Sequence, residues 1–493
     1  MVDAPIEDLL ALDRDVARGE SALARWRSAL ARDPEAFAAE EPLEPVRRVA
    51  GKSTWDALGA LSPIAAEVPL RDGLRVWVYA LMQARIGRDQ EVAWAQAAAR
   101  PSGLLDVDVP RKVSWREAWR GMVASKGPAE ARRWLDAAAH PGPPLAAVAS
   151  AQSARRVEVA RRLGLEHPWS PLGAVPIGEL RRSARGLLDA TEELSRAVWR
   201  EALGPDRDAA ATLDAAIGRA AAHGWPARIT ARWIEDMVAP GGRGVRVDLP
   251  ALPSAAGASS FARALYAFGY SVRASLGRGR HVSGFAGAWS KPDGPGSAAA
   301  PFAIAREPAF VAAHRLGSVF GALPADPAWQ MQALGVVRRS ALAQARTLAR
   351  TALLDVRLHA ARILLGDDAS LAPRDAFDEI GVRLFGAPLD PRLRGAWPRA
   401  RDDEPARWVG LLQARALACT LRDLFDSDWY RNPRAWAHLH AIGAAPARDT
   451  VWRSSPADAA RAPAPASGMH ELDPPALDDA VRAIARALED ALG

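Results

Sequence analysis

Two tyrosines four residues apart are the strongest candidates for a functional pair in this 493-residue chain. Tyr266 and Tyr270 lie in the segment 260–273, whose apolar spacing predicts a helix. Residues at positions i and i+4 share one face of a helix, so both phenols can reach the same ligand. Aromatic pairs at this spacing also serve as plain packing residues, and this alternative stays open.

Two histidines are further candidates for chemistry. His314 lies in the apolar segment 308–320, and His281 closes the basic, glycine-rich stretch 277–281. A lone histidine on a helix cannot hold a metal ion and is more often structural. The stretch around His281 could contact an anion or could be a solvated loop. An acid–base role for either histidine requires a neighbouring carboxylate.

The segments around these residues resemble the oligoendopeptidase and thimet-oligopeptidase type of zinc metallopeptidase, the gluzincins. Residues 266–270, Tyr-Ala-Phe-Gly-Tyr, stand in the frame of that family's His-Glu-Phe-Gly-His motif. Residues 308–320 resemble the second metal helix, and residues 408–421 resemble the late helix. Residues 428–435 resemble a closing loop-to-helix stretch.

The resemblance also implies a substrate cleft. The strand-like residues 245–249 resemble the edge strand that binds the substrate backbone. Val245 and Val247, together with His281, are therefore the candidates for lining that cleft.

The departures from the family pattern remove its chemistry. Zinc needs three good ligands and one open position. Tyr266 and Tyr270 replace the two histidines, and Ala267 replaces the glutamate and cannot move a proton. The third-ligand position falls near Ala313 or His314, where no glutamate stands. We expect no metal, no cofactor and no catalytic residue of the zinc-peptidase kind.

The fold is expected to be mostly α, because apolar residues follow helical spacing over most of the chain. The resemblance implies a helical two-lobed ellipsoid around a central cleft with a very small β element. Residues 245–249 are the best strand candidate. Near the N-terminus, Gly19 is expected to separate two short helices.

Four regions are expected along the chain. Residues 1–145 form an N-terminal helical region, and residues 146–443 form the peptidase-like region with the cleft. Residues 444–472 are a Pro/Ala-rich linker, and residues 473–493 form an amphipathic helix. The apolar face of this last helix is narrow, so we expect it to be dispensable for folding.

Composition indicates which classes of partner and which cellular compartment to expect. The net charge is +6, but lysine occurs at only four positions and acids are interspersed with arginines, so no nucleic-acid partner is expected. No apolar run is long enough to span a membrane, so no membrane partner is expected. The single cysteine, Cys419, lies in an apolar stretch and is expected to be buried. A reducing cytoplasm is the simplest compartment.

The resulting hypothesis is a catalytically inactive peptidase-like protein that binds a peptide or protein partner or acts as a scaffold. One alternative is a helical adaptor unrelated to peptidases, whose C-terminal helix docks a partner. Another is an enzyme with non-zinc chemistry around His281 or His314.

Overall fold

The computed structural model describes most of the chain. The described residues are 9–61, 68–106, 110–115, 117–118, 121, 128–172, 175–203, 262, 265–270, 272–273, 301–305, 311–366, 374–386, 388, 390–394, 403–444 and 476–492.

The described part is mostly helical, as the apolar spacing predicted. Its helices up to residue 203 are α1 (Leu9–Arg32), α2 (Pro34–Phe37), η1 (Glu44–Val46), α3 (Lys52–Ala60), α4 (Val68–Ala99), α6 (Pro128–Ala139), α7 (Gly142–Arg162), α8 (Ile177–Ala190) and α9 (Glu192–Leu203). Those beyond residue 300 are α14 (Phe302–Ala305), α15 (Val311–Ala322), η3 (Leu323–Ala325), α16 (Pro327–Leu334), α17 (Arg338–Leu365), α18 (Arg374–Phe385), η4 (Pro391–Leu393), α19 (Glu404–Phe425), η5 (Trp429–Arg431), α20 (Pro433–Ala444) and α22 (Leu477–Leu492).

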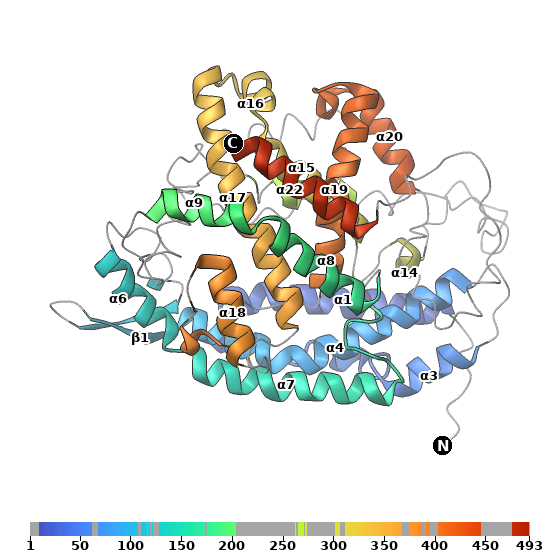
Figure 1. Cartoon of the computed structure of the whole chain (residues 1–493). Coiled ribbons are helices and arrows are strands. Elements are labelled where there is room, and N and C mark those ends of the chain that lie inside the picture. The colour runs from blue at the N-terminus through green and yellow to red at the C-terminus, as the bar shows by residue number, and fades with distance from the viewer. Residues whose placement is uncertain are drawn as a thin grey trace.

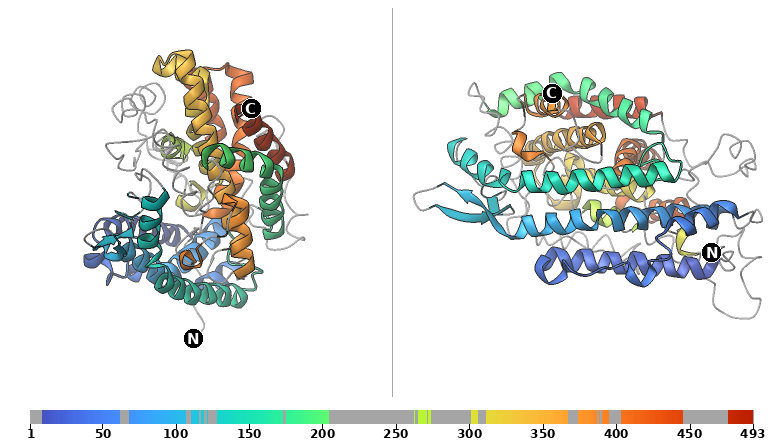
Figure 2. Two further views of the ribbon diagram at one scale, coloured as in Figure 1. Left: turned by 60° about the vertical axis from the view of Figure 1, so that its left-hand side comes forward. Right: turned by 90° about the horizontal axis from the view of Figure 1, so that it is seen from below.

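The long helices form two levels (Figure 1). Helices α1, α4 and α7 lie side by side in the lower level, as the view from below shows (Figure 2). Above them α17 packs against α8, α19 and α22, and α15 packs closely on α19.

A two-stranded hairpin is the β element of the described residues. Strand β1 (Pro101–Leu105) pairs antiparallel with β2 (Arg111–Ser114). Gly103 permits the close packing on α6, because a Cβ atom there would lie 2.2 Å from the carbonyl oxygen of Ala137. The small β element was expected at residues 245–249 instead, and those residues lie outside the described part, as does most of the expected linker.

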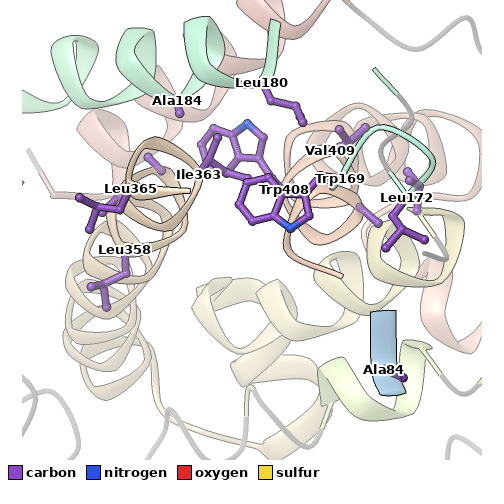
Figure 3. Packing of buried hydrophobic residues seen from close by; sticks show 14 of the residues in the cluster. Ala84, Trp169, Leu172, Leu180, Ala184, Leu358, Ile363, Leu365, Trp408 and Val409 are labelled. Atoms are coloured by element: carbon purple, nitrogen blue, oxygen red, sulfur yellow. The ribbon is translucent and has the colours of Figure 1, made fainter. Parts of the chain in front are cut away.

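The main hydrophobic cluster joins the two levels. Trp408 of α19 is fully buried between α8 and α17, where its indole Nε1 donates a hydrogen bond to Ser183 Oγ at 2.9 Å. Leu180 and Ala184 of α8 and Ile363 of α17 surround it (Figure 3). The expected boundary between residues 145 and 146 falls inside α7, so a division at this point would cut a continuous helix.

Helix α22 belongs to this main cluster. Its predicted apolar face is confirmed, since Val481, Ile484 and Leu488 are buried. They pack against α8, α17 and α19 and lie in the same cluster as Trp408. The expectation that its narrow face keeps this helix out of the core is therefore wrong, because a narrow face suffices where three helices converge on it, and its dispensability for folding stays a prediction.

Gly19 does not separate two helices. Helix α1 runs through it without interruption, and Gly19 is buried. A Cβ atom at this position would lie 2.9 Å from Val46 Cγ2. The glycine therefore serves close packing, and this tertiary contact offsets the low helix propensity of glycine.

Candidate functional site

Three glycines bring the helix of Tyr266 onto α15. This helix, here called the Tyr266 helix, comprises the described helical residues 262, 265–270 and 272–273. A Cβ atom on Gly269 would lie 2.6 Å from the carbonyl oxygen of Leu316, and one on Gly317 would lie 3.0 Å from that of Tyr266. Gly321 continues the same contact one turn later. Any larger residue would force the two backbones apart.

This close crossing places both tyrosines beside His314. The hydroxyl of Tyr266 lies 2.5 Å from Nδ1 of His314, which is a short hydrogen bond. The ring centroid of Tyr270 lies 5.0 Å from that of His314. The side chain of His314 is 5% exposed, whereas both tyrosines are partly exposed. Three candidate residues from two separate segments therefore converge.

Helix α19 completes the site with a residue that the sequence analysis missed. A Cβ atom on Gly410 would lie 2.7 Å from His314 Cβ and 2.9 Å from the carbonyl oxygen of Val311, so α19 and α15 are in backbone contact. The carboxylate of Asp403, just before α19, lies 3.4 Å from Nε2 of His314. The sequence offered one sign of this residue, because Asp403-Glu404-Pro405 is typical of the start of a helix.

Arg407 lies one turn into α19, on the tyrosine side. Its guanidinium carbon is 5.3 Å from the ring centroid of Tyr266, within the range of a cation–π interaction. This guanidinium donates no hydrogen bond to any residue that the structure describes.

The carboxylate of Asp403 lies near Nε2 of His314 without forming a hydrogen bond to it, since this buried nitrogen has no hydrogen-bond partner among the described residues. On the other side of the ring, the Tyr266 hydroxyl and Nδ1 share a hydrogen bond. The polar chain therefore runs from the phenol through the imidazole to the carboxylate. A nucleophile, a base and an orienting group have this order in catalytic triads.

A second histidine–carboxylate pair lies next to the first. Glu404 is fully buried and bonds to Nδ1 of His359 on α17, with Arg362 3.8 Å away. Burial would raise the pKa of Glu404, but the charges of His359 and the nearby arginines outweigh it and lower the pKa. Burial lowers the pKa of His359 despite the carboxylate. The carboxylate of Glu404 therefore has a buried polar partner on α17 as well as nearby positive charge.

The residues around His314 do not fit the zinc ion that the family resemblance would imply. Its two ring nitrogens face Tyr266 and Asp403. Ala267 adds only a methyl group at the position of the family's glutamate. Within the described ranges, no group of three or more His, Cys, Asp or Glu side chains is placed to hold a metal ion.

The remaining candidates lie elsewhere. Val245, Val247 and His281 fall outside the described residues. Cys419 is exposed, which corrects the expectation that it is buried. Leu417 and Leu421 occupy the inward face of α19, so a residue halfway between them points to solvent.

No family model, no curated protein and no solved structure matches this chain. In the parts that the structure describes, every helix is too short or too polar to cross a membrane. The interpretation of the site therefore rests on its own residues and their geometry.

Proposed function

We propose that the chain is a peptidase-like protein without zinc chemistry that binds a peptide or protein partner beside Tyr266, Tyr270 and His314. The observation that carries this proposal is the convergence of these three residues. In the peptidase frame they occupy the positions of the metal ligands, and an unrelated helical bundle would have no reason to bring all three together.

Partial exposure of the two phenols supports a binding role. Tyrosine combines a large apolar ring with a polar hydroxyl and carries much of the binding energy at protein interfaces. The hydroxyl of Tyr266 is held by His314, so that ring is fixed before a partner arrives. A fixed aromatic surface lowers the entropy cost of binding.

We propose a reducing compartment, with the cytoplasm as the simplest choice. Cys419 is the only cysteine and its side chain is exposed, so the chain forms no internal disulfide.

Retention of peptides tests the binding role. The full chain is immobilised and exposed to a defined pool of short synthetic peptides, and the retained peptides are identified by mass spectrometry. We expect Tyr270→Ala to weaken retention by at least about tenfold, as for an aromatic anchor residue. Met331→Ala, at an exposed position of α16, is the control and should change nothing.

Two results would contradict the proposal. The first is a wild-type chain that retains no peptide above the level of an uncoated surface. The second is retention that Tyr270→Ala and Met331→Ala leave equally unchanged, which would place the binding surface elsewhere.

A further inference from the structure

The row of polar groups Tyr266–His314–Asp403 has a chemistry that the binding role does not use: a hydrogen bond joins its first two members, and the carboxylate lies close to the second. The phenol hydroxyl lies 2.5 Å from Nδ1, and Nε2 lies 3.4 Å from the carboxylate. His314 is almost fully buried, whereas Tyr266 and the 27% exposed side chain of Asp403 border solvent. Tyr266, the reactive end of this row of groups, is thus partly exposed.

We propose that Tyr266 is a nucleophile that accepts an acyl group, with His314 as its general base and Asp403 as the positioning residue. This inference goes beyond the proposed binding function and does not depend on it. The loss of zinc chemistry does not leave the site inert, because an adjacent base activates a hydroxyl nucleophile.

Arg407 suits the negative charge that such a reaction creates. Its guanidinium lies over the Tyr266 ring and donates no hydrogen bond to the described residues. Glu404, three residues earlier, bonds to His359 and lies near Arg362, and the charge of Arg407 also acts on it. A cation over the ring of the nucleophile can stabilise the negative charge of a tetrahedral intermediate.

The leaving group selects the class of substrate. An ordinary phenol has a pKa of about 10 and an ordinary thiol a pKa of about 8.5, so a thiolate leaves more readily than a phenolate. An amide nitrogen leaves far less readily than either. A phenol that attacks a peptide bond is therefore expelled again, and the acyl donors that fit Tyr266 are thioesters and aryl esters.

Groups in the site account for every proton and bond in the acyl transfer. The Oη–H bond of Tyr266 breaks and its proton moves to Nδ1 of His314, while Oη forms a bond to the carbonyl carbon of the donor. The bond between that carbon and the thiolate or aryloxide then breaks. The leaving group takes the proton from the imidazolium, which Asp403 stabilises in the meantime. The products are a tyrosyl ester and a free thiol or phenol.

Acetylation of the full chain by p-nitrophenyl acetate tests the proposal without knowledge of the natural substrate. Mass spectrometry of proteolytic fragments measures the acetylation rates of Tyr266 and Tyr270 in the same molecule. Tyr270 is the internal control, since it lies on the same helix and is also partly exposed. General-base catalysis predicts that Tyr266 reacts at least about 100-fold faster.

The variants identify the roles of the other residues. In His314→Gln, the rate at Tyr266 should fall by about 100-fold to that of an unassisted phenol. In Asp403→Asn, the rate should fall less and its pH profile should shift, which a purely structural role would not produce. Phenyl thioacetate should react like the aryl ester, and p-nitroacetanilide should not react.

Equal rates at Tyr266 and Tyr270 in the wild-type chain would overturn the proposal. So would a rate at Tyr266 that neither His314→Gln nor Asp403→Asn changes. Circular dichroism and an unchanged rate at Tyr270 identify variants that remain folded. If the His314→Gln variant unfolds, the rate at Tyr266 in Asp403→Asn tests the proposal instead. That variant should stay folded, because the side chain of Asp403 is partly exposed and lies before the first turn of α19.

Discussion

Asp403 and Glu404 are successive residues whose carboxylates reach histidines on two different helices. Asp403 faces His314 on α15, and Glu404 bonds to His359 on α17. The start of α19 thus ties together the two helices that flank it. The two carboxylates differ in burial, since the side chain of Asp403 is 27% exposed and that of Glu404 is fully buried.

This difference in burial predicts that replacing the carboxylate by an amide lowers the free energy of unfolding by different amounts at the two positions. Glu404→Gln removes a buried charge from His359 and Arg362 and should lower the free energy of unfolding by about 2–4 kcal/mol. Asp403→Asn changes a partly solvated pair and should cost less than about 1 kcal/mol. Urea unfolding of the two variants measures both values. Equal costs would show that burial does not separate the two pairs.

Two glycines offer a matched test of helix contact. Gly410→Ala should destabilise the chain by about 1–3 kcal/mol, because its Cβ atom would lie 2.7 Å from both His314 Cβ and the backbone nitrogen of Arg315. Gly178→Ala, in α8, meets open space and should be neutral or stabilise by up to about 1 kcal/mol. Thermal unfolding compares them. A Gly410→Ala variant as stable as Gly178→Ala would contradict the contact between α15 and α19.

Stability should fall as the pH drops below the ordinary value for histidine. The pKa of His167 is lowered from 6.5 to about 4, mainly by burial and then by the charge of Arg181. Between these values the unfolded chain binds a proton that the folded chain does not, so the free energy of unfolding decreases as the pH falls. Protonation would also remove Nδ1 as the acceptor of the Trp169 backbone N–H at 3.1 Å.

His167→Asn isolates this contribution. The asparagine oxygen can accept the same backbone N–H two residues on, but it does not titrate. Unfolding free energies measured from about pH 7 to about pH 4 should therefore fall less steeply in the variant than in the wild type. The slope that remains belongs partly to His359, whose pKa is also lowered by burial. An unchanged slope would exclude His167 as the source.

The convergence on His314 also predicts a gain of metal binding. Tyr266→His combined with Tyr270→His would surround His314 with two further imidazoles, and three histidines are a zinc ligand set. Metal analysis after dialysis against zinc should find one tightly held zinc ion per chain in the double variant and none in the wild type. Adding His314→Ala is the control and should abolish binding. A double variant without zinc would contradict the peptidase frame.

Local spacing predicted the helices and many of their inward faces, because a helix face depends on residues three and four apart. Val481, Ile484 and Leu488 are examples. Contacts between distant segments were not predictable in this way. Asp403 reaches His314 only because Gly410 lets two helices touch, and Cys419 is exposed because its neighbours on α19 take the inward positions.

Contacts between distant segments also explain the other differences between the sequence predictions and the structure. Gly19 continues a helix that local propensity would interrupt, since Val46 and Leu81 require the space beside it. The hairpin of β1 and β2 was missed because its strands contain a proline, a glycine and only a short alternation of apolar residues. Pairing across the hairpin and packing on α6 stabilise these strands.

The position of α22 in the chain has a consequence during synthesis. Helices α8, α17 and α19 leave the ribosome before residues 477–492 are made, so the apolar surfaces that α22 covers stay open to solvent during that interval. Partly made chains with such surfaces associate readily with one another or with chaperones. A nascent chain that stalls ahead of residue 477 would therefore expose an aggregation-prone apolar surface that α22 otherwise covers.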